Sequence, residues 1–109
     1  MPTAFFVVRA VVVDPPKRAA FDEWHQREHL PDAVKSFGVS KAWRSWGLSD
    51  PSLHQATYQF DDEAALARMM NGEALKRLVA DFNHAWPDVM RTRETFVLAQ
   101  ESSVSAGAA

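Results

Sequence analysis

Apolar stretches along the chain are separated by clusters of turn-forming residues, and their periodicities predict four strands and three helical segments. Alternating or β-branched stretches predict strands over residues 3–13, 39–48, 54–60 and 93–100. Helical spacing predicts helices over residues 17–35, from Asp61 or Asp62 to Met70, and over residues 73–84. The turn at Asp50-Pro51 is short, so the second and third strands form a hairpin.

The order of these elements is strand, helix, strand, strand, helix, strand, with Asn71-Gly72 interrupting the second helix. This βαββαβ order predicts an α+β ferredoxin-like domain, with a four-stranded antiparallel sheet and two helices on one face. A chain of 109 residues fits one domain, which we place at residues 1–100. Residues 101–109 are small and polar, and we expect a flexible tail there.

The first predicted strand is apolar on both of its faces. One face carries Phe5, Val7, Arg9, Val11 and Val13, and the other carries Ala4, Phe6, Val8, Ala10 and Val12. The predicted helices cover one side of the sheet, so the second apolar face needs another cover. We expect a homodimer whose two sheets pack face to face and form a dimeric α/β barrel. The alternative is a monomer whose central strand is apolar on both sides.

The inner face of the first helix changes from apolar to polar along its length. If Phe21 faces the core, the residues one and two turns later share its face. These residues are Trp24, His25, Glu28 and His29. Buried polar groups need partners, and a pocket between helix and sheet that holds water or a ligand would supply them. Pro31 lies inside the same pattern and predicts a kink or a restart near Leu30.

The segment from Phe21 to Asp32 also carries a motif, an aromatic residue followed by Glu-His and a proline late in the helix. The matching residues are Trp24, Glu28, His29 and Pro31. Together with Gly38 and the aromatic-rich strand after it, this segment resembles the EthD-like branch of the dimeric α/β-barrel proteins. The wider group includes antibiotic-biosynthesis monooxygenases, stress-responsive barrel proteins and muconolactone isomerase. The resemblance implies a barrel-forming dimer and, in each subunit, a pocket with His29 at its wall.

The candidate catalytic residues are His29, Glu28 and Asp32. A histidine exchanges protons near neutral pH, so we expect His29 to act as general acid or base, with Glu28 or Asp32 orienting its ring. The alternative is a structural His29 that hydrogen-bonds backbone groups freed by Pro31. The candidate substrate-binding residues are Trp24, His25, Trp43, Arg44, His54 and Tyr58.

The sequence alone does not decide the roles of several polar residues in the predicted strands. Arg9 and Arg44 lie in otherwise apolar strands, where each could bind an anionic substrate group or form an ion pair at the sheet edge or interface. His54 and Tyr58 share one strand face. That face lines either the pocket or the dimer interface, and the alternation alone does not decide between them.

A metal site is not expected, although His25-Gln-Arg-Glu-His29 matches the H-x-x-E-H spelling of one group of zinc peptidases. Such a site needs a third ligand and a much larger scaffold. Neither His54, His84 nor Asp81 is spaced to complete it. We therefore expect chemistry without a metal or an organic cofactor.

Charge and composition exclude further classes. The formal net charge is −2 with no block of Lys or Arg, which argues against a nucleic-acid surface. The sequence has no cysteine, so disulfides and thiolate chemistry are excluded. The apolar run over residues 4–13 contains Arg9 and is too short to span a bilayer. It also lacks the features of a signal peptide, so we expect a cytoplasmic protein.

Three functional hypotheses follow from the residues and the resemblance together. The first is a small-molecule enzyme, a cofactor-independent oxygenase, lyase, cyclase or isomerase, that acts on an apolar or aromatic substrate with His29 as acid or base. The second is a non-catalytic protein that binds small molecules in a degradation or biosynthesis pathway. The third is a barrel protein that binds haem or a metal.

Overall fold

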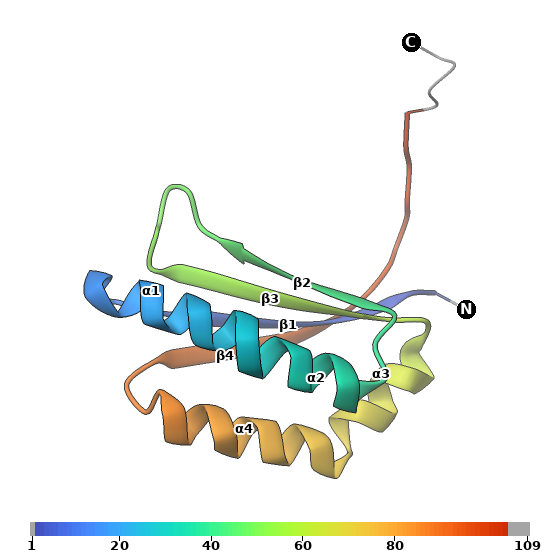
Figure 1. Ribbon diagram of the computed structural model, residues 1–109. Helices are drawn as coiled ribbons and strands as arrows, with labels where there is room; N and C mark the ends of the chain where they lie inside the picture. The colour runs from blue at the N-terminus through green and yellow to red at the C-terminus, as the bar shows by residue number, and fades with distance from the viewer. Residues whose placement is uncertain (1, 105–109) are drawn as a thin grey trace.

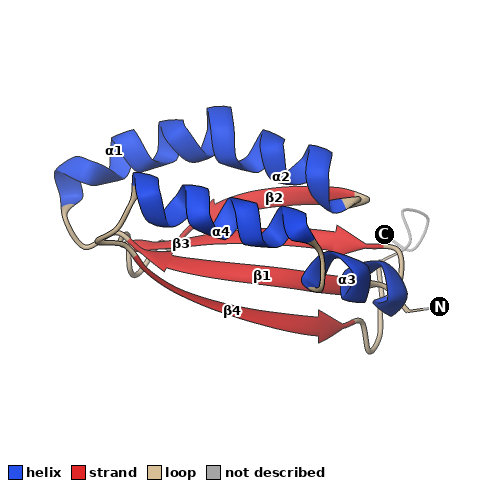
Figure 2. Cartoon of the chain, turned by 90° about the horizontal axis from the view of Figure 1, so that it is seen from below, coloured by secondary structure: helices blue, strands red, loops and turns tan. Residues whose placement is uncertain are grey.

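The computed structural model describes residues 2–104, which form one antiparallel sheet with helices packed on one of its faces (Figure 1, Figure 2). The elements are β1 (Ala4–Val11), α1 (Pro15–Trp24), the π-helical turn η1 (His25–His29), α2 (Leu30–Phe37), β2 (Lys41–Trp46), β3 (Leu53–Phe60), α3 (Glu63–Met70), α4 (Glu73–Ala85) and β4 (Met90–Val97). The strand order across the sheet is β2-β3-β1-β4. The predicted α+β ferredoxin-like βαββαβ fold is confirmed. Within residues 2–104, no helix is long and apolar enough to cross a membrane.

The helix boundaries follow from local sequence signals. Pro15 and Pro16 occupy the first turn of α1, where a missing backbone N–H costs no hydrogen bond. The carboxylate of Asp62 caps α3 by accepting a hydrogen bond of 2.8 Å from the backbone N–H of Ala65. Gly38 ends α2 with a φ of 70°, in the left-handed region that glycine adopts without a steric cost.

The kink predicted near Leu30 is the π-helical turn η1. The backbone N–H of Leu30 donates to the carbonyl of His25, five residues earlier, and α2 begins at Leu30. Pro31 follows directly and has no N–H for the next helical bond. The ribbon runs through this turn as one long, slightly irregular helix (Figure 1).

The last strand begins earlier than predicted. We predicted residues 93–100, whereas β4 spans Met90–Val97 and pairs with β1 from Val11↔Met90 to Ala4↔Val97. The connection from α4 is short, so the chain enters the sheet soon after Pro87. Of the tail predicted over residues 101–109, residues 101–104 have no helix or strand, and residues 105–109 lie outside the described part.

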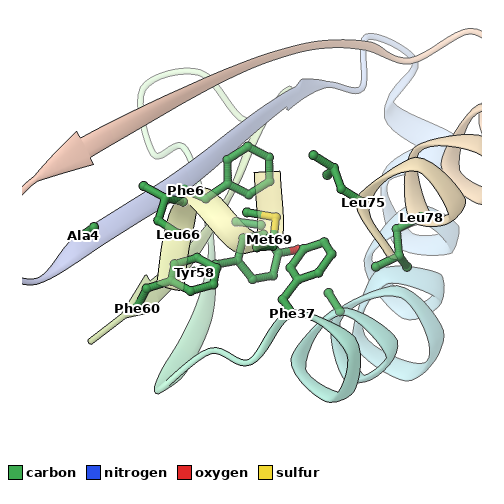
Figure 3. Close-up of a cluster of buried hydrophobic side chains, with 11 residues drawn as sticks. Ala4, Phe6, Phe37, Tyr58, Phe60, Leu66, Met69, Leu75 and Leu78 are labelled. Atoms are coloured by element: carbon green, nitrogen blue, oxygen red, sulfur yellow. The ribbon is translucent and has the colours of Figure 1, made fainter. Parts of the chain in front are cut away.

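The core lies between the sheet and the helices. The even-numbered residues of β1 face the helices together with His54, Ala56, Tyr58 and Phe60 of β3. Phe6 stacks on Tyr58 with ring centroids 5.8 Å apart, and Phe37 of α2 packs edge-on against both rings (Figure 3). Leu66 and Met69 of α3 close this cluster at one end. His54 and Tyr58 therefore face the helices.

The opposite face of the sheet carries no helix from the described part of the chain (Figure 2). It presents the odd-numbered side chains of β1 with their neighbours in register, among them Trp43 and Phe96, which are 40% and 44% exposed. Arg9 lies on this face, and its Nε donates a hydrogen bond of 3.0 Å to the Oε1 atom of Gln55. This is the second apolar face that the sequence predicts.

Candidate functional site

A cavity of about 610 Å³ lies between the helices and the sheet. Its walls come from β1, η1, α2, β3, α3, α4 and β4, so residues distant in sequence meet there. Most of the lining is apolar and includes Phe6, Val8, Phe37, Tyr58, Leu78 and Phe82. A mostly apolar concavity with few polar groups is typical of a site for a small organic molecule.

Three histidine side chains gather at one wall of this cavity. His25 and His29 come from the π-helical turn, and His54 comes from β3 beside it. The ring centroids of His25 and His54 are 4.6 Å apart, and those of His25 and His29 are 5.0 Å apart. The π-helical turn η1 and the beginning of β3 therefore bring three imidazole rings together in an apolar setting.

Burial keeps all three rings neutral at physiological pH. Loss of solvation lowers the pKa of His25 to about 2 and that of His29 to about 4, and the charge of Arg91 lowers the latter further. Burial and the neighbouring Arg44 lower the pKa of His54 to about 4. A neutral imidazole accepts a proton at one nitrogen and donates at the other.

His54 is held by a polar chain that runs from β2 to α1. The Nε–H of Arg44 donates to Nε2 of His54 over 3.4 Å, and its guanidinium also pairs with the carboxylate of Asp22. The indole N–H of Trp46 donates to the same carboxylate over 2.7 Å. That hydrogen bond and the guanidinium charge hold the pKa of Asp22 below its usual value. Because Nε2 of His54 accepts, its proton lies on Nδ1.

Several residues predicted for the site lie at or beside the cavity. His25, His29, His54 and Tyr58 line it. Arg44 contacts it through His54. Trp24 stands behind His29, with which it stacks at a centroid distance of 4.8 Å.

Three predicted site residues lie elsewhere. Trp43 is on the opposite face of the sheet, because the alternation of β2 puts Trp46 and Arg44 on the helix side. Glu28 is exposed, because the π-helical turn rotates it away from the face that carries His29. Asp32 pairs with Arg77 of α4 at 2.8 Å, so its carboxylate joins two helices, and its negative charge acts to raise the pKa of His29 against the larger effect of burial. Among residues 2–104, neither acid hydrogen-bonds His29, and the orientation of its ring by Glu28 or Asp32 stays a prediction.

Sequence reasoning missed the cationic side of the cavity. Arg91 and Arg93 of β4 line it with Lys76 and Asn83 of α4. The predicted strand began at residue 93 and left out Arg91. That Arg91 and Arg93 lie on one face of the same strand was therefore not predicted. Asp22 was also missed, because nothing in the sequence shows that β2 lies opposite this part of α1.

The H-x-x-E-H spelling contains two possible metal ligands, His25 and His29. Among residues 2–104, no three His, Asp or Glu side chains are placed to hold one metal ion. Glu28 of that spelling is exposed.

Solved structures of other proteins share this fold, although no protein-family model and no curated protein matches the sequence. SnoaB, a cofactor-independent oxygenase from Streptomyces nogalater, superposes with a TM-score of 0.66 at 16% identity over 91% of this chain and 95% of that chain. An ethyl tert-butyl ether d (EthD) family protein from Bacillus halodurans gives 0.62 at 17% identity over 86% and 97%. A dimeric ferredoxin-like protein from an uncultured marine organism gives 0.59 at 13% identity over 94% and 100%. The expected fold of the EthD-like proteins is thereby confirmed.

Proposed function

We propose that this chain is a small-molecule enzyme in which His29 acts as a base on an apolar or aromatic organic substrate. The observation that carries the proposal is a neutral, half-buried His29 at the wall of an apolar cavity, stacked on Trp24. A proton of an acidic O–H or C–H group of the substrate passes to a ring nitrogen of His29. The bonding electron pair stays on the substrate, and the proton returns to the product or to water.

His29 is better placed for this role than the other two histidines. His25 is 3% exposed, and its Nδ1 atom is buried without a hydrogen-bond partner in the described part of the chain. His54 is 1% exposed, and its Nε2 atom already accepts from Arg44. The ring of His29 is half-buried and has no side-chain hydrogen bond among the described residues, so its acceptor nitrogen is available to a ligand.

The structural comparisons support this type of chemistry. SnoaB is a cofactor-independent oxygenase with the same fold over most of both chains. A reaction that needs no cofactor requires the protein to activate the substrate itself, and proton removal is a direct way to do so. The EthD-family neighbour supports the relation to the proteins that the Trp24 to Pro31 motif resembles.

A second copy of the chain is proposed to cover the open face of the sheet. Val7 and Thr57 lie at its centre, with Trp43 and Phe96 toward its edges. A sheet face that no helix of the described residues covers and that carries partly exposed Trp43 and Phe96 is typical of an interface, and the dimeric ferredoxin-like neighbour supports the same arrangement. The cavity lies on the other side of the sheet, so each subunit keeps its own cavity.

Deuterium exchange at an acidic C–H group tests the base without knowledge of the natural substrate. Beta-tetralone is an apolar aromatic ketone whose exchange in D2O is followed by proton NMR. We expect the protein to accelerate exchange, with a rate that rises with pH near 4 and is level at neutral pH, because only the neutral form of His29 accepts a proton. His29→Gln abolishes the acceleration, and His84→Gln, which removes an exposed histidine, retains it. Equal exchange with and without the wild-type protein contradicts the proposal.

A non-catalytic binding protein is the second candidate. It is favoured by one observation, that neither Glu28 nor Asp32 hydrogen-bonds His29 to orient or activate it. This candidate predicts that beta-tetralone perturbs the NMR signals of cavity residues while its exchange rate stays that of the buffer.

A further inference from the structure

The edge strand β4 places two arginines side by side at the cavity. Arg91 and Arg93 are paired in register with Ala10 and Val8 of β1, two residues that face the helices. Both arginines line the cavity. The guanidinium of Arg91 lies over the ring of Phe82, 3.9 Å from its centroid, which holds it against the apolar wall.

No acidic side chain of residues 2–104 pairs with either of these two arginines. Among the described residues, those that line the cavity include Lys76, Arg91 and Arg93 but no Asp or Glu. Within residues 2–104, Arg91 and Arg93 form no ion pair, and Arg91 donates instead to the neutral side-chain oxygen of Asn83. Arg44 and Arg77, which also join separate elements, each pair with an aspartate.

The electrostatic setting of Arg91 and His29 favours the binding of an anion. Burial first and the charge of Arg93 second lower the pKa of Arg91, so its charged state is held at a cost. The charge of Arg91 in turn lowers the pKa of His29. An anion bound between the two guanidiniums offsets both effects, because it adds the opposite charge at the same place.

We infer that the cavity binds an organic anion whose charged group, a carboxylate, sulfonate or phenolate, lies at Arg91 and Arg93 while its apolar body fills the space toward Phe6 and Tyr58. The inference rests on the proposed function, since it names the substrate class of the same cavity. Planar guanidinium donors suit such oxyanions, and the apolar lining suits an aromatic ring system. A charged group at Arg91 also puts the apolar body of the ligand beside His29, across the ring of Phe82.

Two fluorescent probes that differ in charge test this inference. Anilinonaphthalenesulfonate is an aromatic anion, and phenylnaphthylamine is its counterpart without the sulfonate. We expect the full chain to bind the anion about tenfold or more tightly than the neutral probe, as one or two charge-assisted hydrogen bonds predict. Affinity for the anion falls as sodium chloride is raised, whereas affinity for the neutral probe does not fall.

Matched variants locate the effect. Arg91→Gln and Arg93→Gln each weaken binding of the anion about tenfold and leave binding of the neutral probe unchanged. Arg68→Gln removes the same charge from the exposed surface of α3, outside the cavity lining, and leaves both affinities unchanged. Since Arg91 packs on Phe82, circular dichroism checks that the Arg91→Gln variant is folded. Arg93 is exposed, so Arg93→Gln provides a second, independent measurement.

The outcomes separate this inference from the function on which it rests. If both probes bind with equal affinity and neither substitution changes it, the anionic preference is wrong while the apolar cavity and the role of His29 stand. If neither probe binds, both the cavity and the anionic preference are contradicted. Exchange of beta-tetralone, an uncharged ketone, tests His29 independently of Arg91 and Arg93.

Discussion

Trp24 and His29 are five positions apart in the chain, yet their rings stack with centroids 4.8 Å apart and planes inclined by 22°. In a regular α-helix, residues five apart lie roughly 140° apart around the axis and do not meet in this way. The π-helical turn from His25 to His29 brings them to one side. It also turns Glu28 outward, although a regular helix would place it one turn above Trp24. Turns of this kind occur frequently at functional sites.

The stack with Trp24 is predicted to hold His29 in its buried, neutral state. Trp24→Leu removes the aromatic face, admits water to the imidazole and raises its pKa from about 4 toward 6.5. The loss of packing also lowers the free energy of unfolding by roughly 1–3 kcal/mol. Trp24→Phe keeps an aromatic face and serves as the control, with a pKa close to that of the wild type. NMR titration of the His29 ring protons measures both values, and an unchanged pKa in Trp24→Leu contradicts the prediction.

The contact between Arg44 and His54 predicts one tautomer and one direction of pKa change. Nitrogen NMR at neutral pH is expected to show His54 protonated at Nδ1, because Nε2 accepts from the Nε–H of Arg44. Arg44→Gln removes the positive charge beside the ring and raises its pKa above about 4. Lys35→Gln removes an equal charge from an exposed position and leaves the His54 titration unchanged. A doubly populated tautomer in the wild type contradicts the assignment.

Much of the fold could be predicted from the sequence, because alternation and helical spacing report directly on buried faces. The element order, the hairpin at Asp50-Pro51, the interruption near Leu30 and the apolar second face of β1 all follow from such local patterns. The predictions that failed depend on local helix geometry, which the spacing of apolar residues does not report. Glu28 was placed by assuming a regular helix, whereas the turn contains an extra residue.

The site was harder to predict than the fold, because it depends on which face of each strand meets the helices. His54 and Tyr58 share a face by alternation, but the pairing with β1 decides that this face lines the cavity. The pairing of β2 with β3 places Trp43 on the other side of the sheet. Arg91 was missed because the position of the last strand is set by its register with β1.

Stability is predicted to fall as the pH is lowered from 7 to 5. In the unfolded chain a histidine binds its proton near pH 6.5, whereas in the folded protein burial holds the pKa of His25 at about 2. Because the unfolded state then binds more protons, the stability that neutral His25 contributes is fully present above pH 6.5. This contribution is lost as the pH falls below that value. For His25 the loss amounts to about 2 kcal/mol at pH 5. The lowered pKa of Asp22 affects stability mainly below pH 3.8, outside the range from pH 7 to pH 5.

His25→Leu tests this account by urea unfolding at pH 7 and pH 5. The variant removes the titrating group and a buried nitrogen that has no partner, so its stability is expected to depend less on pH than that of the wild type. His84→Gln removes an exposed histidine and serves as the control. The account fails if His25→Leu loses as much stability as the wild type between the two pH values.

The open face of the sheet predicts a homodimer that a single charge disrupts. Trp43 is 40% exposed on this face, and Val34 is 43% exposed on α2, so the two positions have similar exposure in one subunit. In a dimer through the sheets, Trp43→Arg places a charge in the interface and weakens association about thirtyfold or more, whereas Val34→Arg leaves association unchanged. Sedimentation equilibrium at micromolar concentration is expected to give twice the subunit mass of 12.2 kDa for the wild type and Val34→Arg. A wild type that sediments as a single subunit, or a Trp43→Arg variant that stays fully dimeric, contradicts the packing of two sheets. In that case the apolar second face of β1 belongs to a monomer.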